Sequence, residues 1–454
     1  NTTGVVIPWL DGSPADVDPG TIPVGTRFYV DPVNGDDNAD GSLAHPWQHI
    51  QYVVDTYVAT QEYDSLPPDE NTPLVDKNPD GPVQPGDVIV LLDGEHGALK
   101  ITRAFNSDYV TITAMEGESP VLQSVRIAGA SMWHLHALLI TSELAQGEVE
   151  ASLLNIENHS WVGQAHHIYV HDCTLRNIED SSAWGITEWN DRTTSGVQIS
   201  GQHVRLENNL IKNINFGISV TGPNNHIVAN TVENFAGDGL RGIADDLLFE
   251  YNTVKNCYDV NENHDDGFQS WSMDGVPPRR VVLRGNTIIN YEDPQQPLSG
   301  QLQGIGCFDG FYEDWIIENN LVIVDHWHGI TLLGARRVLI RNNTVVNRDP
   351  SHEADPWINI GAHKDGTSSE QCVIRNNIAV NSIQADNDTL DESNLLVPDA
   401  DLTTWFVSPD TFDYHLLPDS PALDAGSETD PPPLDHDQTP RPQGDAMDIG
   451  CYEQ

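Results

Sequence analysis

Three aspartates give this 454-residue sequence its clearest chemical signal, because they stand just before the glycines of a repeated segment. Asp238 precedes Gly239, and the pair Asp265–Asp266 precedes Gly267 one repeat later. Adjacent coils of a strand repeat lie about 4.8 Å apart, so we expect the three carboxylates within a few ångströms of one another. Carboxylates that close repel each other, so either one keeps its proton or a cation such as Ca²⁺ lies among them. The simpler alternative is that each Asp-Gly pair only forms a turn.

Basic side chains fall in the same repeats. Arg241 lies three residues after Asp238, and His328 precedes the glycine of a later repeat. A guanidinium can bind a substrate carboxylate through two hydrogen bonds, and an imidazole titrates near neutral pH. We therefore expect Arg241, His328 and Asp266 to be catalytic, with Lys364 as a further basic candidate. Arg241 could instead simply pair with Asp238.

Polar and aromatic side chains near these positions are the candidates for binding a substrate. They are His264, Gln269, Trp271, Gln303 and Asp309. The indole of Trp271 offers a flat face on which a sugar ring can stack, although the insertion over residues 272–302 could bury it instead.

A repeat supplies the elements that must position these residues. Between residues 165 and 385 the chain repeats a glycine, an alternating strand, a turn, a second alternating strand, and then an asparagine with an apolar pair. The marker residues of this last motif are Cys173, Asn209, Asn230, Asn252, Asn286, Asn320, Asn343 and Asn377. Their spacings are 36, 21, 22, 34, 34, 23 and 34 residues, so the basic coil has 21–23 residues and some coils carry insertions. A period near 22 with short strands is typical of a parallel β-helix.

The marker asparagines are expected to be structural, because stacked amides can donate to one neighbour and accept from the other at a buried corner. In the strand after each repeat glycine, period-two alternation directs apolar residues inward. The outward column is then Gln198, Ser219, Arg241, Gln269, Gly306 and Thr331. We expect this outward face to form the substrate groove.

The sequence thus predicts an all-β solenoid that forms one continuous domain. Residues 1–85 are expected to form an N-terminal cap with a short helix near residues 47–58. Residues 86–385 are expected to form the parallel β-helix, and residues 386–454 a C-terminal tail that closes the far end, since solenoids need polar caps.

The charge limits the possible partners. The sequence has 69 acidic and 21 basic residues, a net charge of −48 and a pI near 4.3. Such a chain repels nucleic acid and anionic membrane surfaces. No run approaches the ~18 apolar residues that a membrane-spanning helix needs. An acidic, lysine-poor surface is typical of a halophilic or marine protein, or of an ordinary acidic secreted one.

Two further features concern the compartment. The five cysteines show no C-x-x-C pattern and do not indicate a disulfide framework. The chain opens at Asn-Thr-Thr-Gly without a charged or apolar leader, so either a signal peptide was removed or none existed. We expect an extracellular protein.

Motifs near both ends of the chain resemble a known group of proteins. The segment from FYVDP at 28–32 to PW at 46–47, and the segment from SPALDAGS at 420–427 to DIGCYE at 448–453, carry the resemblance. They are similar to secreted right-handed parallel β-helix proteins of the pectate-lyase-like and polygalacturonase-like superfamily. The resemblance implies a right-handed β-helix that acts on carbohydrate. The same fold also hosts hydrolases, epimerases and phage tailspikes.

The aspartate pattern looks like that of calcium-dependent pectate-type lyases of this superfamily. There an Asp on one coil and an Asp-Asp-Gly on the next hold calcium, which the resemblance places at Asp238, Asp265 and Asp266. Calcium neutralises the uronate carboxylate, and a Lys or Arg removes the neighbouring proton. This chain departs from the pattern, because it has QGIGCF at 303–308 where a lysine might stand. Arg241 is the expected replacement.

The pattern is also similar to that of polygalacturonase-type hydrolases. These have an Asp, an Asp-Asp one coil later, a Gly-His-Gly and a basic pair. The corresponding positions here are Asp238, Asp265–Asp266, the Trp-His-Gly at 327–329 and His363–Lys364. This chain departs from that pattern in two places, because an extra coil intervenes before His328 and the basic pair is not Arg-x-Lys.

We therefore expect a secreted, monomeric enzyme that degrades an acidic, uronate-containing polysaccharide, for example from marine algae. The expected reaction is a cation-assisted β-elimination with Ca²⁺ as cofactor. An inverting glycoside hydrolase and a uronate epimerase remain open. A tailspike-like or surface carbohydrate-binding β-helix is the alternative from another class of protein.

Overall fold

The structure is a computed structural model that describes residues 25–144, 150–349, 351 and 354–454. Residues 1–24 of the predicted N-terminal cap lie outside the described residues. The chain divides into two compact units, which are described separately. Among the described residues, the N-terminal unit extends to Thr231, and the C-terminal unit runs from Val232 to Gln454.

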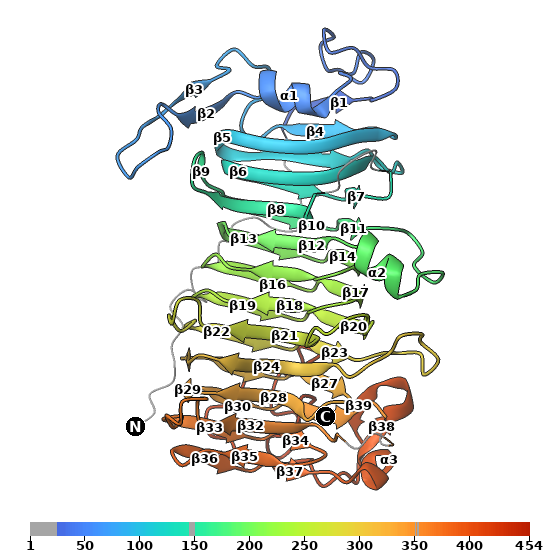
Figure 1. Ribbon diagram of the computed structural model, residues 1–454, viewed down its shortest axis with the longest axis vertical. Coiled ribbons are helices and arrows are strands. Elements are labelled where there is room, and N and C mark those ends of the chain that lie inside the picture. Colours follow the sequence, from blue (N-terminus) through green and yellow to red (C-terminus); the bar gives the residue numbers. More distant parts are fainter. Residues whose placement is uncertain (1–24, 145–149, 350, 352–353) are drawn as a thin grey trace. The chain divides into compact units, whose positions relative to one another are not determined.

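Parallel strands wound into coils make up both units (Figure 1). In a complete coil the chain passes through three strands, and each strand pairs in parallel with the corresponding strand of the next coil. Three sheets therefore run along each unit. This arrangement confirms the predicted fold class, an all-β right-handed parallel β-helix. No helix of the described chain is long and apolar enough to cross a membrane.

The N-terminal unit begins with long strands that bend from one sheet into the next. Strand β6 pairs with β8 through Val125 and with β10 through Trp133. The strands of this unit are β1 (Arg27–Val30), β2 (Thr60–Tyr63), β3 (Leu74–Lys77), β4 (Val88–Leu91), β5 (Glu95–Ala114), β6 (Val121–His136), β7 (Leu139–Thr141), β8 (Ser152–His159), β9 (Gly163–Gln164), β10 (His166–His171), β11 (Thr174–Arg176), β12 (Ser195–Ile199), β13 (Gln202–Glu207), β14 (Leu210–Ile214), β15 (Ile218–Val220) and β16 (Asn225–Val228). Its helices are α1 (Ile50–Thr56), which confirms the helix predicted near 47–58, and α2 (Ile186–Arg192). Strand β17 (Thr231–Phe235) follows.

The C-terminal unit contains regular coils, and its first sheet carries the candidate active site. The first sheet consists of β18 (Leu240–Gly242), β21 (Asp266–Trp271), β24 (Gln303–Asp309), β28 (His328–Leu333), β32 (Trp357–Gly361) and β35 (Ile383–Ala385). The second sheet consists of β19 (Leu247–Glu250), β22 (Val281–Arg284), β26 (Ile316–Glu318), β30 (Leu339–Arg341), β33 (Cys372–Arg375) and β36 (Thr389–Glu392). The third sheet consists of β20 (Thr253–Cys257), β23 (Thr287–Ile289), β27 (Leu321–Val324), β31 (Thr344–Asn347), β34 (Ile378–Ala379) and β37 (Leu395–Leu396).

Short elements complete this unit. Strands β25 (Tyr312–Glu313) and β29 (Ala335–Arg336) pair in parallel. In the tail, β38 (Phe406–Ser408) and β39 (Asp413–Leu416) form an antiparallel hairpin near α3 (Leu402–Trp405) and two 3₁₀ turns, η1 (Asp399–Asp401) and η2 (Pro409–Thr411).

Alternation along the first-sheet strands fills the interior of the solenoid. Ile305, Cys307, Ile330 and Leu332 are at most 1% exposed, as the sequence pattern predicts. Burying such side chains supplies the main driving force for folding, since each fully buried one contributes about 1.5–3 kcal/mol.

The predicted asparagine ladder is present within each unit. In the C-terminal unit the Asn286 amide donates to Asn320 Oδ1 at 2.9 Å and accepts from the Asn252 amide at 3.0 Å. In the N-terminal unit the Asn209 amide donates to Asn230 Oδ1 at 2.9 Å. The ladder asparagines are buried, so these bonds satisfy polar groups that water does not reach.

The C-terminal tail lies against the outer face of the third sheet. Leu321, Ile323 and Val346 are buried there in one cluster with Leu416 and Ile449 of the tail. The sequence suggested closure of the far end, whereas this packing places the tail along the side of the coils.

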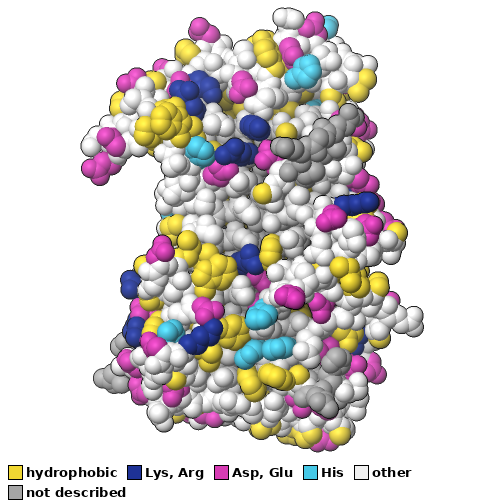
Figure 2. Space-filling model, viewed as in Figure 1, with side chains coloured by type: hydrophobic (Ala, Val, Ile, Leu, Met, Phe, Trp, Pro, Cys, Tyr) yellow, Lys and Arg dark blue, Asp and Glu magenta, His cyan; other side chains and the backbone are white. Residues whose placement is uncertain are grey.

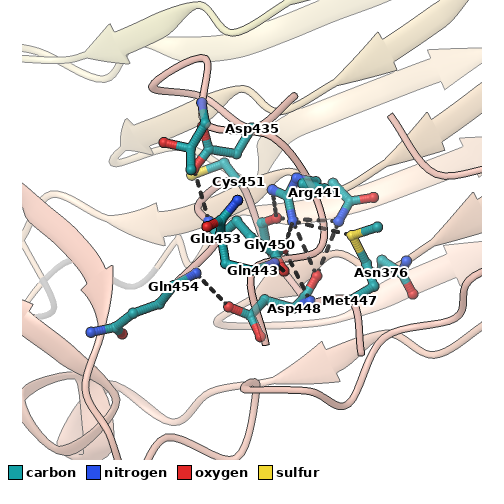
Figure 3. A network of polar contacts seen from close by, with 12 residues as sticks. Asn376, Asp435, Arg441, Gln443, Met447, Asp448, Gly450, Cys451, Glu453 and Gln454 are labelled. Carbon is teal, nitrogen blue, oxygen red and sulfur yellow. Dashed lines mark hydrogen bonds and ion pairs between the residues drawn. The ribbon is translucent and has the colours of Figure 1, made fainter. Parts of the chain in front are cut away.

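A buried ion pair supports the tail (Figure 3). Arg441 donates to Glu453 Oε2 at 2.7 Å and to the Gly450 carbonyl at 2.9 Å, and both charged side chains are fully buried. The Arg441 guanidinium thereby joins two parts of the tail that are about ten residues apart.

Candidate active site

Asp238 and Asp266 stand at the start of neighbouring strands of the first sheet. Asp238 lies just before β18, Asp266 begins β21, and the Asp266 backbone N–H donates to Asp238 Oδ1 at 3.1 Å. The other oxygen of Asp238 accepts from Arg241 Nε. Both aspartates are buried. Asp238 and Arg241 therefore form the ion pair that the sequence left as an alternative to a catalytic arginine.

Asp266 has a different environment, although it lies next to Asp238. Its Oδ2 accepts from Gln269 Nε2 at 2.9 Å, while its Oδ1 is buried without a hydrogen-bond partner among the described residues. Burial, followed by the charge of Asp238, raises the pKa of Asp266 well above its ordinary value. Burial also raises the pKa of Asp238, but the Arg241 guanidinium paired with it opposes that rise, so the proton of this pair resides on Asp266.

Asp265, which we expected beside these two, interacts with another group. Its carboxyl hydrogen-bonds with the Cys257 thiol at the end of β20, and its Oδ1 is buried without a partner in the described part of the chain. Burial, followed by the charge of Asp238, raises the pKa of Asp265 to about 7.

The three aspartates do not form a calcium cage as they stand. Ca²⁺ takes six to eight oxygen ligands around one point. Both oxygens of Asp238 already accept hydrogen bonds, and Asp265 is engaged with Cys257. Within the described residues, ligand atoms of Asp238, Asp265 and Asp266 do not all lie within 4.8 Å of one another. Calcium at this position stays a prediction from the sequence, and no step proposed below depends on it.

His328 begins strand β28 and is partly buried among aromatic rings. Its ring centroid lies 4.7 Å from that of Phe308 and 5.1 Å from that of His326, and its Nδ1 lies 3.0 Å from Thr331 Oγ1. The Trp357 indole donates to the same hydroxyl at 2.9 Å. Burial, followed by the neighbouring His326, lowers the pKa of His328 to about 4. The ring is therefore neutral at neutral pH and can accept a proton.

The sheet register relates His328 to the aspartates. Gln303 pairs with Asp266 on the neighbouring strand β24, and β24 pairs with β28 through Ile305 and Ile330. Gln303 thus lies between Asp266 and His328 along the first sheet. In Figure 2, histidine, acidic and apolar side chains gather where Figure 1 labels β24 and β28.

The candidate substrate-binding residues lie around this centre. Trp271 is half-buried, with the Arg241 guanidinium 5.7 Å from its ring centroid. His264 is exposed and close enough to Asp238 to act on its charge. Trp327 was not among the predicted binding residues, yet its side chain is 50% exposed beside His328 and offers a surface for a sugar ring. The sequence feature that could have indicated Trp327 as a binding residue is the run His-Trp-His before Gly329.

Lys364 and Asp309, predicted separately, contact each other. Lys364 Nζ lies 2.5 Å from Asp309 Oδ1, and both side chains are exposed. The neighbouring His363 stacks on Phe311 with ring centroids 4.8 Å apart. Within the described part of the chain, Lys364 forms no hydrogen bond or ion pair with Asp238, Asp266 or His328, so its catalytic role stays a prediction.

Solved structures similar to this chain are enzymes that act on carbohydrates. The pectate lyase Pel9A is 15% identical, over 95% of this chain and 97% of that chain, with a TM-score of 0.49. A lacto-N-biosidase from Eubacterium ramulus is 14% identical, over 82% of this chain and 68% of that chain, with a TM-score of 0.42. The alginate lyase AlyGC is 15% identical, over 70% of this chain and 51% of that chain, with a TM-score of 0.36. Two of these three are polysaccharide lyases, the kind of enzyme that the sequence motifs resemble. No protein-family model matches the sequence, and no curated protein matches it.

Proposed function

We propose that this chain is a lyase that cleaves an acidic, uronate-containing polysaccharide by β-elimination on the outer face of the first sheet. The observation that carries the proposal is the combination of Arg241, Asp266 and His328 on strands β18, β21 and β28 at one part of the first sheet. These residues supply a fixed positive charge, a carboxyl that keeps its proton, and a neutral imidazole. β-Elimination next to a carboxylate needs these three functions.

Arg241 and His328 would act on the uronate ring. The guanidinium binds the substrate carboxylate and stabilises the negative charge that builds there as the adjacent C–H bond breaks. The unprotonated nitrogen of His328 accepts that proton. The electron pair of the C–H bond then forms a carbon–carbon double bond.

Asp266 would act on the leaving group. As the double bond forms, the bond from the ring to the glycosidic oxygen breaks, and the protonated carboxyl donates its proton to that oxygen. The proton held by His328 returns to Asp266 through solvent after the products leave. Asp266 is buried in the free protein, with Phe308 beside it over Gly306. We expect Phe308 to shift when a substrate binds.

The charge of the whole chain bears on the substrate. A protein of net charge −48 repels a polyanion at long range, and salt screens that repulsion over about 10 Å at 0.1 M. We therefore propose that the enzyme works outside the cell in salt-rich surroundings, as a monomer. Activity on a polyuronate should rise between low and moderate ionic strength.

The test is a panel of polyuronates and sulfated algal polysaccharides, with two readings on each sample. Ultraviolet absorbance reports the double bond of a lyase product, and new reducing ends report chain cleavage. Both signals together support the proposal, and His328→Gln should lose both. Reducing ends without absorbance would contradict β-elimination.

A glycoside hydrolase is the second candidate, because Asp238 and Asp266 are adjacent carboxyls with different partners: Arg241 donates to Asp238, and Gln269 donates to Asp266. Such a pair can supply the base and the acid of glycoside hydrolysis. It would give reducing ends alone. An epimerase would change the uronate composition without cleavage, and a binding protein would retain the polymer without either change.

A further inference from the structure

A second cluster of reactive side chains lies in the N-terminal unit, on the second sheet. His136 ends strand β6 and His171 ends the neighbouring strand β10. The two residues are direct partners in the sheet register, and their ring centroids are 4.6 Å apart. The proposed function uses neither of them.

Asp172 joins the two histidines because of its backbone conformation. Consecutive residues of a strand point to opposite faces, so a residue after His171 would ordinarily face away from it. Asp172 has a φ of 54°, in the left-handed region, which ends the strand and breaks the alternation. Its Oδ2 lies 2.5 Å from His171 Nδ1 and 3.8 Å from His136 Nε2.

Neighbouring side chains orient these three groups. Thr113 Oγ1 lies 2.8 Å from His136 Nδ1, on the side of the ring opposite to Asp172. The His134 ring lies with its Nε2 2.6 Å from His171 Nε2, and Thr111 holds the other nitrogen of His134 at 3.1 Å. Asn208 donates to Asp172 Oδ1. The ring nitrogens turned away from the cluster are thus engaged, which is the usual support around metal-binding histidines.

We propose that His136 Nε2, His171 Nδ1 and Asp172 Oδ2 bind one divalent transition-metal ion of the Zn²⁺ class. One ligand atom from each of the three residues lies within 4.8 Å of the other two, and this is the one such group found among the described residues. Bonds of 2.0–2.2 Å in tetrahedral geometry separate ligand atoms by about 3.3 Å, so shifts of less than about 1 Å bring these atoms to the ion. Two imidazoles with one carboxylate favour Zn²⁺ over Ca²⁺, which prefers oxygen ligands only.

The cluster is open to solvent on one side. The Asp172 side chain is 41% exposed and that of His136 is 21% exposed, whereas His171 is 5% exposed. An ion can therefore enter past Asp172, and water can occupy the fourth ligand position. The ion would link β6 to the turn after β10 and so hold two adjacent coils together.

The test measures metal binding by the full chain, independently of polysaccharide cleavage. Protein stripped with a chelator is titrated with Zn²⁺ by calorimetry, and its melting temperature is followed with and without the ion. We expect one Zn²⁺ per chain and a higher melting temperature with Zn²⁺. Co²⁺ bound at the same site should give the visible absorption of a tetrahedral complex.

Variants separate this site from adventitious binding to other histidines. Asp172→Asn and His136→Gln should each weaken Zn²⁺ binding by about 100-fold or more, and Thr113→Val by about 10–100-fold. His203→Gln, in another histidine group of the same unit, should bind Zn²⁺ like the parent. Equal Zn²⁺ affinity of Asp172→Asn and the parent would overturn the proposal, as would a parent chain that binds no Zn²⁺. If the cluster has no metal and His171 only hydrogen-bonds with Asp172 and His134, the parent chain should bind no Zn²⁺.

Discussion

Asp266 Oδ1 occupies the space that a side chain at position 306 would need. An ideal Cβ on Gly306 would lie 2.1 Å from that oxygen, far closer than any real contact. Gly306 belongs to the outward column of the first sheet, in register with Gln269. The glycine thus makes room for the one carboxyl that we assign as the acid.

Gly306→Ala should therefore displace Asp266 and lower the rate of polysaccharide cleavage by about 100-fold, the lower end of the effect of losing an acid. The melting temperature should change by only a few degrees. Gly361→Ala is the matched control, because its Cβ would approach only side-chain atoms at 3.0 Å or more, the Leu333 Cδ2 methyl at 3.0 Å and the Asn359 amide at 3.6 Å. If Gly306→Ala and Gly361→Ala have equal activity, Asp266 is not the acid.

Arg241→Ala should reduce turnover by about 10²–10⁴-fold, because it removes the charge that stabilises the developing carboxylate charge. It should also lower the melting temperature, since it leaves the buried Asp238 unpaired. Arg279→Ala removes a more exposed ion pair with Glu313 and should change neither quantity appreciably. Kinetics and thermal unfolding on the three proteins check this. Turnover of Arg241→Ala within about tenfold of the parent would exclude this face as the active site.

The pH dependence of stability should report His328. Burial and His326 lower its pKa from 6.5 to about 4, so between these values the unfolded chain binds more protons at this position than the folded chain. Folding stability from this group is complete above pH 6.5 and is lost as the pH falls toward 4. His328→Gln should show a shallower loss over that window in urea unfolding, with its turnover reduced by about 10²–10⁴-fold. An unchanged slope would mean that the pKa of His328 is not depressed.

Removing calcium tests whether Arg241 or a bound Ca²⁺ supplies the positive charge beside Asp238, Asp265 and Asp266. If Arg241 supplies that charge, a calcium chelator should leave the cleavage rate within about twofold. A loss that Ca²⁺ restores and Zn²⁺ does not would establish the calcium site predicted from the sequence. It would also show that Asp238, Asp265 and Asp266 rearrange around the ion, and Asp265→Ala should then abolish the response.

Asn286→Ala should test the ladder. The side chain of Asn286 donates to Asn320 Oδ1 and the Phe249 carbonyl and accepts from Asn252, all at buried positions. Leaving such groups unsatisfied should lower the free energy of unfolding by about 2–4 kcal/mol. The exposed Asn387→Ala should change it by less than about 0.5 kcal/mol. Denaturant unfolding of the two variants and the parent gives the comparison.

The sequence alone was sufficient to predict the architecture, a parallel β-helix. A coil of 21–23 residues, the marker asparagines and the alternating strands are local regularities, and each coil repeats the same packing problem. The structure confirms the ladder within each unit and the inward apolar positions. The repeat also predicted one column that contains Asp238, Asp266, Gln303 and His328. This was possible because paired strands in register place equivalent positions of successive repeats side by side.

Only the tertiary structure decided what each of these side chains contacts. The spacing placed Arg241 near Asp238 but could not tell a substrate-binding arginine from one paired with that aspartate. It placed Asp265 beside Asp266, whereas the fold engages Asp265 with Cys257. The pairing of Lys364 with Asp309 joins residues 55 positions apart, which no repeat predicts.

The cluster of His136, His171 and Asp172 could likewise be predicted from the sequence only in part. The spacing in Trp-His-Leu-His at 133–136 puts two histidines on one face of a strand, and this much is visible in the sequence. The meeting of His136 and His171 with Asp172 depends on a left-handed backbone at Asp172 and on the register between β6 and β10. Periodicity sets which face a residue occupies, because it is a property of the local backbone. Protonation and pairing depend on burial and on neighbours distant in the chain, and these exist only once the coils have stacked.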